Sequence, residues 1–384
     1  MTGLHVRLTG ADVLTPDGLQ KVPLILDAGR IADGDGAARE VDLSGYIVLP
    51  GIVDVHGDGF ERHLAPRRGA MKDIDQGLVT AEAELAANGI TTAVLAQFYS
   101  WEGGMRGPEF AERVMTGVAQ VRGNVVTDLH TQLRFETPML DDYGAALEFI
   151  DRHSVAYCVF NDHLPHVALE KGKQPKGLIG KSLRIGRNPE VHLAMMQEMH
   201  ARRAEVPAAV DGLSAALAAR GVRMGSHDDR SAEARAEWRA RGATLAEFPE
   251  TLEAAEAARA GGDAVIMGAP NVVRGGSHNG NVSAADMVMM GLVDALASDY
   301  HYPSLRRAAF FLLDAGVCDL ATAWGLISAG PARILGLSDR GALVPGMRAD
   351  LLVLEMRTRR VAATLAGGRI SYLQGDVAQR FLGG

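Results

Sequence analysis

The middle of the chain, residues 51–336, alternates short apolar runs with longer Ala-rich segments of helical periodicity. Eight of the apolar runs have the length and composition of buried strands. They span residues 52–56, 90–97, 128–136, 155–161, 222–227, 243–248, 264–267 and 295–299. The segments between them predict helices at 72–88, 191–203, 208–220 and 251–260. Because eight strands alternate with helical segments, we expect an α/β fold, a (β/α)8 TIM-type barrel.

The two ends of the chain share a different pattern, of short alternating apolar runs bounded by Pro and Gly. At the N-terminus these runs span residues 4–8, 22–26 and 46–50, and at the C-terminus 349–354 and 361–365. We therefore expect a small β-sandwich domain formed from both chain termini, residues 1–50 and 337–384, beside a barrel of residues 51–336.

Composition and charge predict the cellular compartment of the protein and exclude some classes of binding partner. The net charge of −8 predicts no general affinity for nucleic acid or for an anionic membrane. No apolar run approaches the roughly 20 residues of a membrane span, and residues 1–14 lack the features of a signal peptide. The two cysteines, Cys158 and Cys318, lie in apolar runs, so we expect buried thiols in a reducing, cytoplasmic protein.

Polar side chains end most of the predicted strands, which is where barrel enzymes carry their active residues. His56 and Asp58 are two positions apart, so on an extended strand they point to the same side and suit a divalent metal ion. A polar loop is the simpler alternative. Glu136 could bridge two metal ions or pair with Arg134. After the fourth strand, one of His163 and His166 is expected to be a ligand and the other a loop residue.

Three further strand ends carry candidate residues. His227 is followed directly by two acids, an unusual end for a purely structural strand, and Glu247 is a weaker candidate. Asp299 could cap the next helix, or it could take a proton from water on a metal ion. Five or six strands of eight thus end in His, Asp or Glu, which predicts a divalent metal that lowers the pKa of bound water towards about 7.

Two cationic segments are candidate binding regions for an anion. The loop 268–281 contains four glycines, Arg274 and His278, and leads to a helix near Ser283. Glycine lets backbone N–H groups approach an anion closely, although a mobile lid would look the same. Residues 171–189 hold six cations and no acid: Lys171, Lys173, Lys176, Lys181, Arg184 and Arg187. Such a cluster could focus an anionic substrate, or it could be a solvated loop.

Several of these motifs resemble a known family. Residues 45–56, 89–92 and 346–351 are similar to the amidohydrolase superfamily. More narrowly, His56-Gly57-Asp58, the segments 226–229 and 298–300, and the loop 268–281 resemble the hydrolase family of the carbon–phosphorus lyase pathway of phosphonate use. The resemblance covers nearly the whole chain.

The resemblance implies a metal-dependent diphosphatase that releases pyrophosphate from a ribose methylphosphonate triphosphate. Its metal ligands would be His56, Asp58, Glu136, His163 and His227. Asp299 would orient or deprotonate the attacking water, and the phosphorylated small molecule would be held by Lys171, Lys173, Arg274 and His278. An amidohydrolase acting on an amide, a cyclic ureide or a deaminase-type substrate is the alternative, although it would need fewer cations around its cleft.

The same resemblance sets expectations for the metal and for assembly. Most amidohydrolases carry His-x-His on the first strand, whereas this chain has Asp58, a harder ligand. That difference tilts the expected one or two ions from zinc towards manganese or iron. Large barrels of this type often pair, so a homodimer is the assembly to expect.

Overall fold

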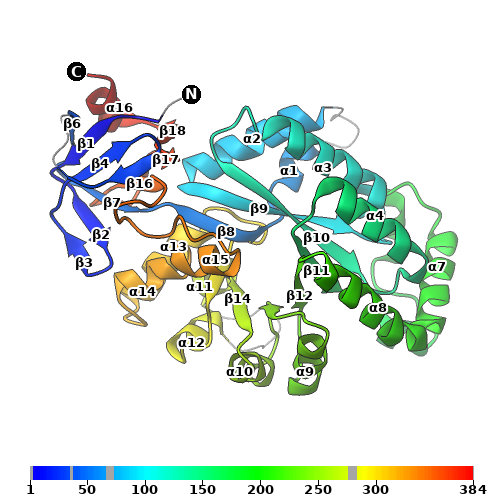
Figure 1. Cartoon of the computed structure of the whole chain (residues 1–384). Coiled ribbons are helices and arrows are strands. Elements are labelled where there is room, and N and C mark those ends of the chain that lie inside the picture. The colour runs from blue at the N-terminus through cyan, green and yellow to red at the C-terminus, as the bar shows by residue number, and fades with distance from the viewer. Residues whose placement is uncertain (1–2, 35–37, 66–72, 276–282, 384) are drawn as a thin grey trace. The chain divides into compact units, whose positions relative to one another are not determined.

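The computed structural model of the chain describes residues 3–34, 38–65, 73–275 and 283–383 (Figure 1). Within them, eight strands form one sheet in the order β15-β14-β13-β12-β11-β10-β9-β8. These strands are β8 (Ile52–Gly57), β9 (Ile90–Tyr99), β10 (Asp128–Glu136), β11 (Tyr157–Asn161), β12 (Arg223–His227), β13 (Leu245–Glu247), β14 (Ala264–Gly268) and β15 (Ala295–Ala297). An isolated parallel bridge between Gly57 and Asp299 joins the two ends of this order. The predicted barrel is therefore confirmed, with a strand in each of the eight predicted runs.

Helices connect the strands, and four of the longer helices begin at residues whose side chains cap them. The longer helices are α2 (Ile74–Ala87), α3 (Pro108–Val121), α4 (Tyr143–His153), α7 (Pro189–Ala201), α8 (Val206–Ala219), α9 (Ala232–Ala240), α10 (Leu252–Ala260) and α13 (Ser304–Asp314). The side chains of Asp73, Asn188, Ser231 and Thr251 accept hydrogen bonds from the first-turn amides of α2, α7, α9 and α10. These contacts fix where the helices start, because they satisfy amides that have no partner within the helix.

One connection differs from the prediction. The Gly-rich segment 268–281 does not begin as a loop, because Ala269–Arg274 forms the short helix α11. Pro270 stands in the first turn of α11, where its fixed φ suits a helix. The helix ends at Gly275, whose φ of +72° lies in the left-handed region that favours glycine. The remainder of the predicted loop, including His278, lies outside the described residues.

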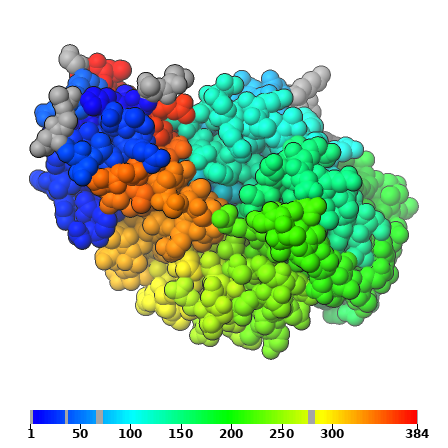
Figure 2. Space-filling view, in the orientation of Figure 1, coloured from blue at the N-terminus to red at the C-terminus, as the bar shows by residue number. Residues whose placement is uncertain are grey.

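The strands of the two termini form two further sheets. A four-stranded sheet has the order β5-β4-β1-β6 and a six-stranded sheet the order β18-β17-β16-β7-β2-β3. These strands are β1 (Val6–Thr9), β2 (Asp12–Thr15), β3 (Gly18–Gln20), β4 (Leu24–Asp27), β5 (Arg30–Ala32), β6 (Arg39–Asp42), β7 (Tyr46–Pro50), β16 (Leu351–Glu355), β17 (Val361–Ala366) and β18 (Arg369–Leu373). Leu43, Val48, Leu351 and Val353 are buried in their shared core. The blue N-terminal and the orange-to-red C-terminal surfaces lie together in Figure 2, which confirms the predicted β domain from both termini.

The chain divides into two compact units, and the barrel strands are distributed between them. Unit 1 comprises Met1–Leu95, Gly117–His130 and Ala264–Gly384, and unit 2 comprises Ala96–Thr116 and Thr131–Asp263. Cys158 is buried in the core of unit 2, as expected. Cys318 is only half-buried, because it lies in the short connection between α13 and α14 (Leu320–Gly325) rather than in the core. In the part of the chain that the structure describes, no helix is long and apolar enough to cross a lipid bilayer.

Candidate active site

Strand β10 supplies three polar side chains to one face of the barrel sheet. Gln132, Arg134 and Glu136 alternate with the apolar residues Leu133 and Phe135, and all five are buried. Alternation along a strand places the three polar side chains on the same side of the sheet. They reach three different strands of unit 2, so β10 connects the polar ends of β11, β12 and β13.

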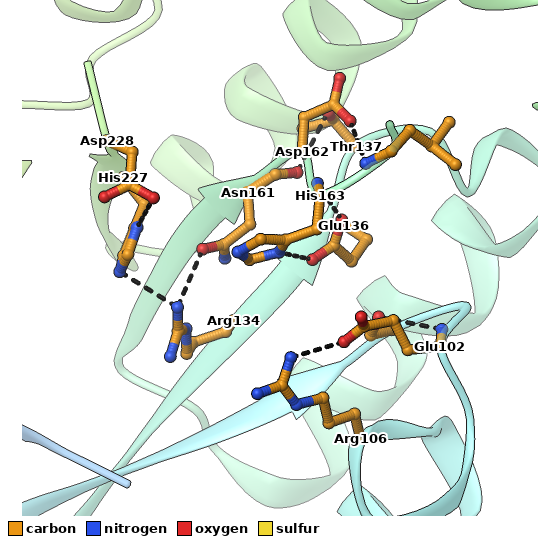
Figure 3. Close-up of polar contacts among 12 residues, drawn as sticks. Glu102, Arg106, Arg134, Glu136, Thr137, Asn161, Asp162, His163, His227 and Asp228 are labelled. Carbon is orange, nitrogen blue, oxygen red and sulfur yellow. Dashed lines mark hydrogen bonds and ion pairs between the residues drawn. The ribbon is translucent and has the colours of Figure 1, made fainter. Parts of the chain in front are cut away.

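Arg134 connects β10 to β12 (Figure 3). Its side chain is 5% exposed and its guanidinium carbon lies 3.9 Å from the centroid of the Phe98 ring. Nη2 donates to Asn161 Oδ1 at 3.4 Å and to His227 Nε2 at 3.0 Å. Because a guanidinium only donates, Nε2 of His227 is the unprotonated nitrogen. Its Nδ1 faces Asp228 Oδ2 at 3.0 Å.

The surroundings of His227 favour the neutral imidazole. Burial lowers the pKa of His227, and the charge of Arg134 lowers it further, while Asp228 acts in the opposite direction. A neutral ring with one proton directed at a carboxylate is the form that histidine takes as a metal ligand. The protonation state that these surroundings favour for His227 is the one that a metal ligand requires.

Glu136 pairs with His163 rather than with Arg134. A carboxylate oxygen of Glu136 is hydrogen-bonded to His163 Nδ1, and the second accepts from the His163 backbone amide at 3.0 Å. Burial lowers the pKa of His163, but the hydrogen bond and the charge of Glu136 outweigh it and the net shift is upward. His166 lies elsewhere, bonded to Asp162 at 2.9 Å and to His200 at 2.8 Å. Of the two candidate histidines, His163 is thus the one at Glu136.

Glu247 is a stronger candidate ligand in the structure than the sequence indicates. It is fully buried at the end of β13, and its Oε1 accepts from Gln132 Nε2 at 2.5 Å and from the Tyr157 hydroxyl. Its carboxylate and the His227 imidazole offer ligand atoms within 4.8 Å of each other. A carboxylate and a neutral imidazole are a donor set that fits a divalent metal ion. The signal in the sequence was the place of Glu247 at the end of the sixth apolar run, whereas its partners Gln132 and Tyr157 lie on other strands.

The backbone turns sharply after three of these strands. Asp228, Phe248 and Asp299 have φ angles of +61°, +53° and +56°, although none is a glycine. Asp228 and Phe248 directly follow the last residues of β12 and β13, and Asp299 lies two residues after the end of β15. Left-handed backbone is costly for residues with a Cβ, and it is found where the surrounding structure enforces it.

In unit 1, backbone hydrogen bonds hold the ends of β8 and β15 together. The Asp299 amide donates to His56 O at 3.1 Å, and the Asp58 amide donates to Asp299 O at 2.9 Å. His56 is fully buried, whereas Asp58 and Asp299 are partly exposed. Helix α13 begins after Pro303, without a side-chain cap, so the alternative role of Asp299 as a helix cap is wrong. These backbone hydrogen bonds thus hold His56, Asp58 and Asp299 close together at the ends of β8 and β15.

The buried carboxylate of Asp54 stabilises the ends of β8 and β15. Asp54 is fully buried and accepts from the Ser298 amide at 3.0 Å and from the Ser298 hydroxyl at 2.5 Å. Burial raises the pKa of Asp54 to about 6, against the opposing effect of these hydrogen bonds. Since Ser298 directly precedes Asp299, Asp54 fixes the position from which the Asp299 side chain leaves the strand.

The cationic candidates differ in how firmly the structure holds them. Arg274 donates to the Tyr300 hydroxyl, in unit 1, and Arg62, which sequence reasoning missed, donates to Tyr300 O at 3.0 Å. Lys171 and Lys173 are exposed beside α5 (His166–Glu170), and their side chains make no hydrogen bond or ion pair with any described residue. The structure therefore gives the two lysines no fixed place in the site, and it does not describe His278.

A second arginine that the sequence did not single out lies beside Phe98 in unit 2. The Arg106 guanidinium is 4.2 Å from the centroid of that ring and 2.6 Å from Glu102 Oε2 (Figure 3). Arg106 lies in the segment after β9, and its side chain is 40% exposed. Two guanidinium groups thus pack against the Phe98 ring, the buried one of Arg134 and the partly exposed one of Arg106.

Comparisons with known proteins place this arrangement in a family. No family model matches the chain. The alpha-D-ribose 1-methylphosphonate 5-triphosphate diphosphatase of Escherichia coli (strain K12) is 32% identical over 333 residues, covering 84% of this chain and 86% of that protein.

Solved structures share the fold at low identity. A Xaa-Pro dipeptidase is similar with a TM-score of 0.65 at 13% identity, covering 96% of this chain and all of the other. The N-acetylglucosamine-6-phosphate deacetylase of Pasteurella multocida has a TM-score of 0.63 at 11% identity, covering 96% and 99%. The chain is therefore a hydrolase of the amidohydrolase superfamily and belongs to the alpha-D-ribose 1-methylphosphonate 5-triphosphate diphosphatase family.

Proposed function

We propose that this hydrolase cleaves a phosphoanhydride bond of alpha-D-ribose 1-methylphosphonate 5-triphosphate and releases pyrophosphate. The observation that carries the proposal is the 32% identity, over 84% of the chain, to the Escherichia coli protein named for that reaction. The guanidinium groups of Arg134 and Arg106 add support, because such groups bind phosphate oxygens in a bidentate manner.

A divalent metal ion, zinc, manganese or iron, is part of the proposal. Its proposed ligands are His56 and Asp58 in unit 1 and Glu136, His163 and His227 in unit 2, to which the structure adds Glu247 as a candidate. The neutral state of His227 and the nearby carboxylate of Glu247 support it. When bound, such an ion acts as a Lewis acid and makes water a nucleophile at neutral pH.

Other side chains would accept a proton from the attacking water or bind the negatively charged phosphates of the substrate. Asp299 is the proposed base, because its backbone is held on both sides and its side chain is partly exposed to water. The leaving pyrophosphate gains charge in the transition state, which cationic side chains stabilise. Arg274 and His278 are the proposed contacts to the phosphates, and the exposed Lys171 and Lys173 are proposed to attract the phosphates through their charge.

The test is to incubate purified protein of known metal content with the triphosphate and to measure pyrophosphate. Release at about 10⁴ M⁻¹s⁻¹ or faster, the range of an enzyme on its own substrate, would support the proposal. A panel of dipeptides, cyclic ureides and aminopurines would run in parallel. Turnover of one of these, with no pyrophosphate released by metal-loaded protein, would replace the diphosphatase proposal with an amidohydrolase one.

A further inference from the structure

One arginine in unit 2 is completely buried away from the candidate ligands, and the proposed reaction gives it no role. Arg235 lies on α9 and is 0% exposed. Its Nε is 3.0 Å from Asp263 Oδ2 and its Nη1 is 2.9 Å from Asp229 Oδ2, so one guanidinium is shared by two buried carboxylates. Burying three charges is expensive, and it persists only where their geometry is well satisfied.

The same guanidinium contacts the strands that carry His227 and Glu247. Nη1 donates to the Ser226 hydroxyl, which itself donates to Asp229 at 2.5 Å. Ser226 and Asp229 lie on either side of His227-Asp228 in the chain, so Arg235 ties both ends of that turn.

Arg235 also contacts the entry to β13. Nη2 donates to Ala243 O, and Nη1 to Leu245 O at 3.4 Å. Glu247 follows two residues after Leu245, so a shift of this strand would move the carboxylate. A planar guanidinium with five donors can hold two strand segments at once, which a lysine ammonium cannot do with the same geometry.

We propose that Arg235 is a positioning residue that sets the separation and orientation of His227 and Glu247 for a divalent metal ion. The inference rests on the proposed function for the metal but not on the identity of the substrate. Arg235 acts through residues that flank these ligands, and side chains bonded directly to metal ligands typically change metal affinity by 10- to 100-fold when they are altered, so we expect an effect at the lower end of this range.

The helix also offers a matched control. Arg239 is one turn further along α9 and pairs with the same Asp263 oxygen at 2.7 Å. Its side chain donates to Ala257 O at 2.6 Å, and among the described residues no hydrogen bond or ion pair joins that side chain to β12 or to residues 243–245. Loss of Arg239 should therefore disturb the buried charges without changing the position of His227.

The experiment compares Arg235→Lys, Ser226→Ala and Arg239→Gln with the wild-type protein. Ser226→Ala removes only the hydroxyl bridge, so it keeps the inference testable if Arg235→Lys does not fold. Manganese dissociation constants are measured by competition with a chelator, and melting temperatures are recorded beside them. We expect about tenfold weaker metal binding in the first two variants and less than a twofold change in Arg239→Gln. Folded Arg235→Lys and Ser226→Ala proteins with wild-type affinity would overturn the inference.

A second measurement separates this inference from the proposed metal chemistry. In metal-free protein labelled with 15N-histidine, the His227 resonances are assigned by their loss in His227→Gln. We expect a fixed Nδ1–H tautomer in the wild type and a tautomer mixture in Arg235→Lys and Ser226→Ala. If the wild-type protein binds no metal yet shows this difference, the metal proposal fails while the positioning role stands. An unchanged tautomer in folded variants refutes the positioning role.

Discussion

Nη2 of Arg134 lies 3.0 Å from Nε2 of His227, so a permanent cation contacts the unprotonated nitrogen of a candidate metal ligand. Burial lowers the pKa of His227 and the charge of Arg134 lowers it further, and the Phe98 ring packs against one side of the guanidinium. Under the proposed function, this guanidinium would also donate to a phosphate oxygen of the substrate.

Arg134→Met should lower kcat/KM for pyrophosphate release by about 10²- to 10³-fold, the usual effect of removing one preorganised donor. It should also raise the pKa of His227, because one of the influences that lower it is gone. Steady-state kinetics and an NMR titration of metal-free protein measure the two effects. The control is Arg113→Met, which removes an exposed arginine 5.7 Å from the centroid of the Phe110 ring in the same unit. A loss below threefold would contradict this role for Arg134.

Asp299→Asn should keep the metal and reduce turnover by about 10³-fold, within the range for removal of a general base. The backbone contacts of residue 299 do not involve its side chain, so the strand ends should stay in place. Metal content by elemental analysis and kcat at saturating substrate are the measurements. Asp314→Asn, which removes an exposed carboxylate paired with Arg359, is the control. Unchanged turnover in Asp299→Asn would refute the role of Asp299 as base.

The exposed lysines should act through their charge alone. Replacing Lys171, Lys173 and Lys176 together by Gln should raise KM for the triphosphate several-fold at low salt, because they steer the anion but have no fixed partner. At about 1 M salt, where the screening length falls to roughly 3 Å, the variant and the wild type should converge. A difference that persists at high salt would instead indicate direct contact between these lysines and the phosphates.

Asp128 should contribute stability that depends on pH. Its carboxylate contacts Arg340 at 2.6 Å and His130 at 3.2 Å. Burial raises the pKa of Asp128, but these partners outweigh it and hold the pKa well below 3.8. A depressed pKa gives stability that is present above the unfolded value and is lost as the pH falls through the folded one. We expect Asp128→Asn to lose about 2 kcal/mol of unfolding free energy at pH 7.

Denaturant unfolding of both proteins at pH 7, 4 and 3 tests this dependence. The difference between wild type and Asp128→Asn should shrink between pH 4 and pH 3, because the unfolded carboxyl is then protonated. A difference that is the same at all three values would mean that the charge of Asp128 contributes nothing.

The barrel could be predicted from the sequence because buried parallel strands read as continuous apolar runs that are separated by helical segments. The ends of the runs were less certain. The sixth strand is only Leu245–Glu247 and the eighth only Ala295–Ala297, and a residue with positive φ follows each of them, Phe248 directly and Asp299 two positions later. The turn at Phe248 has no local signal, because an aromatic residue rarely adopts left-handed backbone; Asp adopts it more often, but Asp299 alone does not mark a turn.

The candidate residues were predicted by type, but their pairings were not. Glu136 was weighed as a partner of Arg134, which is two positions away on one strand, and it contacts His163 instead. Arg134 contacts His227, 93 positions later. Such contacts depend on the order of strands in the sheet, which a single sequence does not contain. Arg235 was missed for the same reason, since an arginine on an amphipathic helix normally indicates a solvated face.

The pairing of β7 with β16 has a consequence for how the chain is made. Leu351 pairs with Pro50 in that ladder, so β7 is synthesised roughly 300 residues before the strand that pairs with it on this side. At the usual rate of about 5 to 20 residues per second, the wait on the ribosome is roughly 15 to 60 seconds. Throughout that time the N-terminal strands expose an open ladder edge to other nascent chains. Slower translation should therefore increase aggregation of this protein before its last sheet is complete.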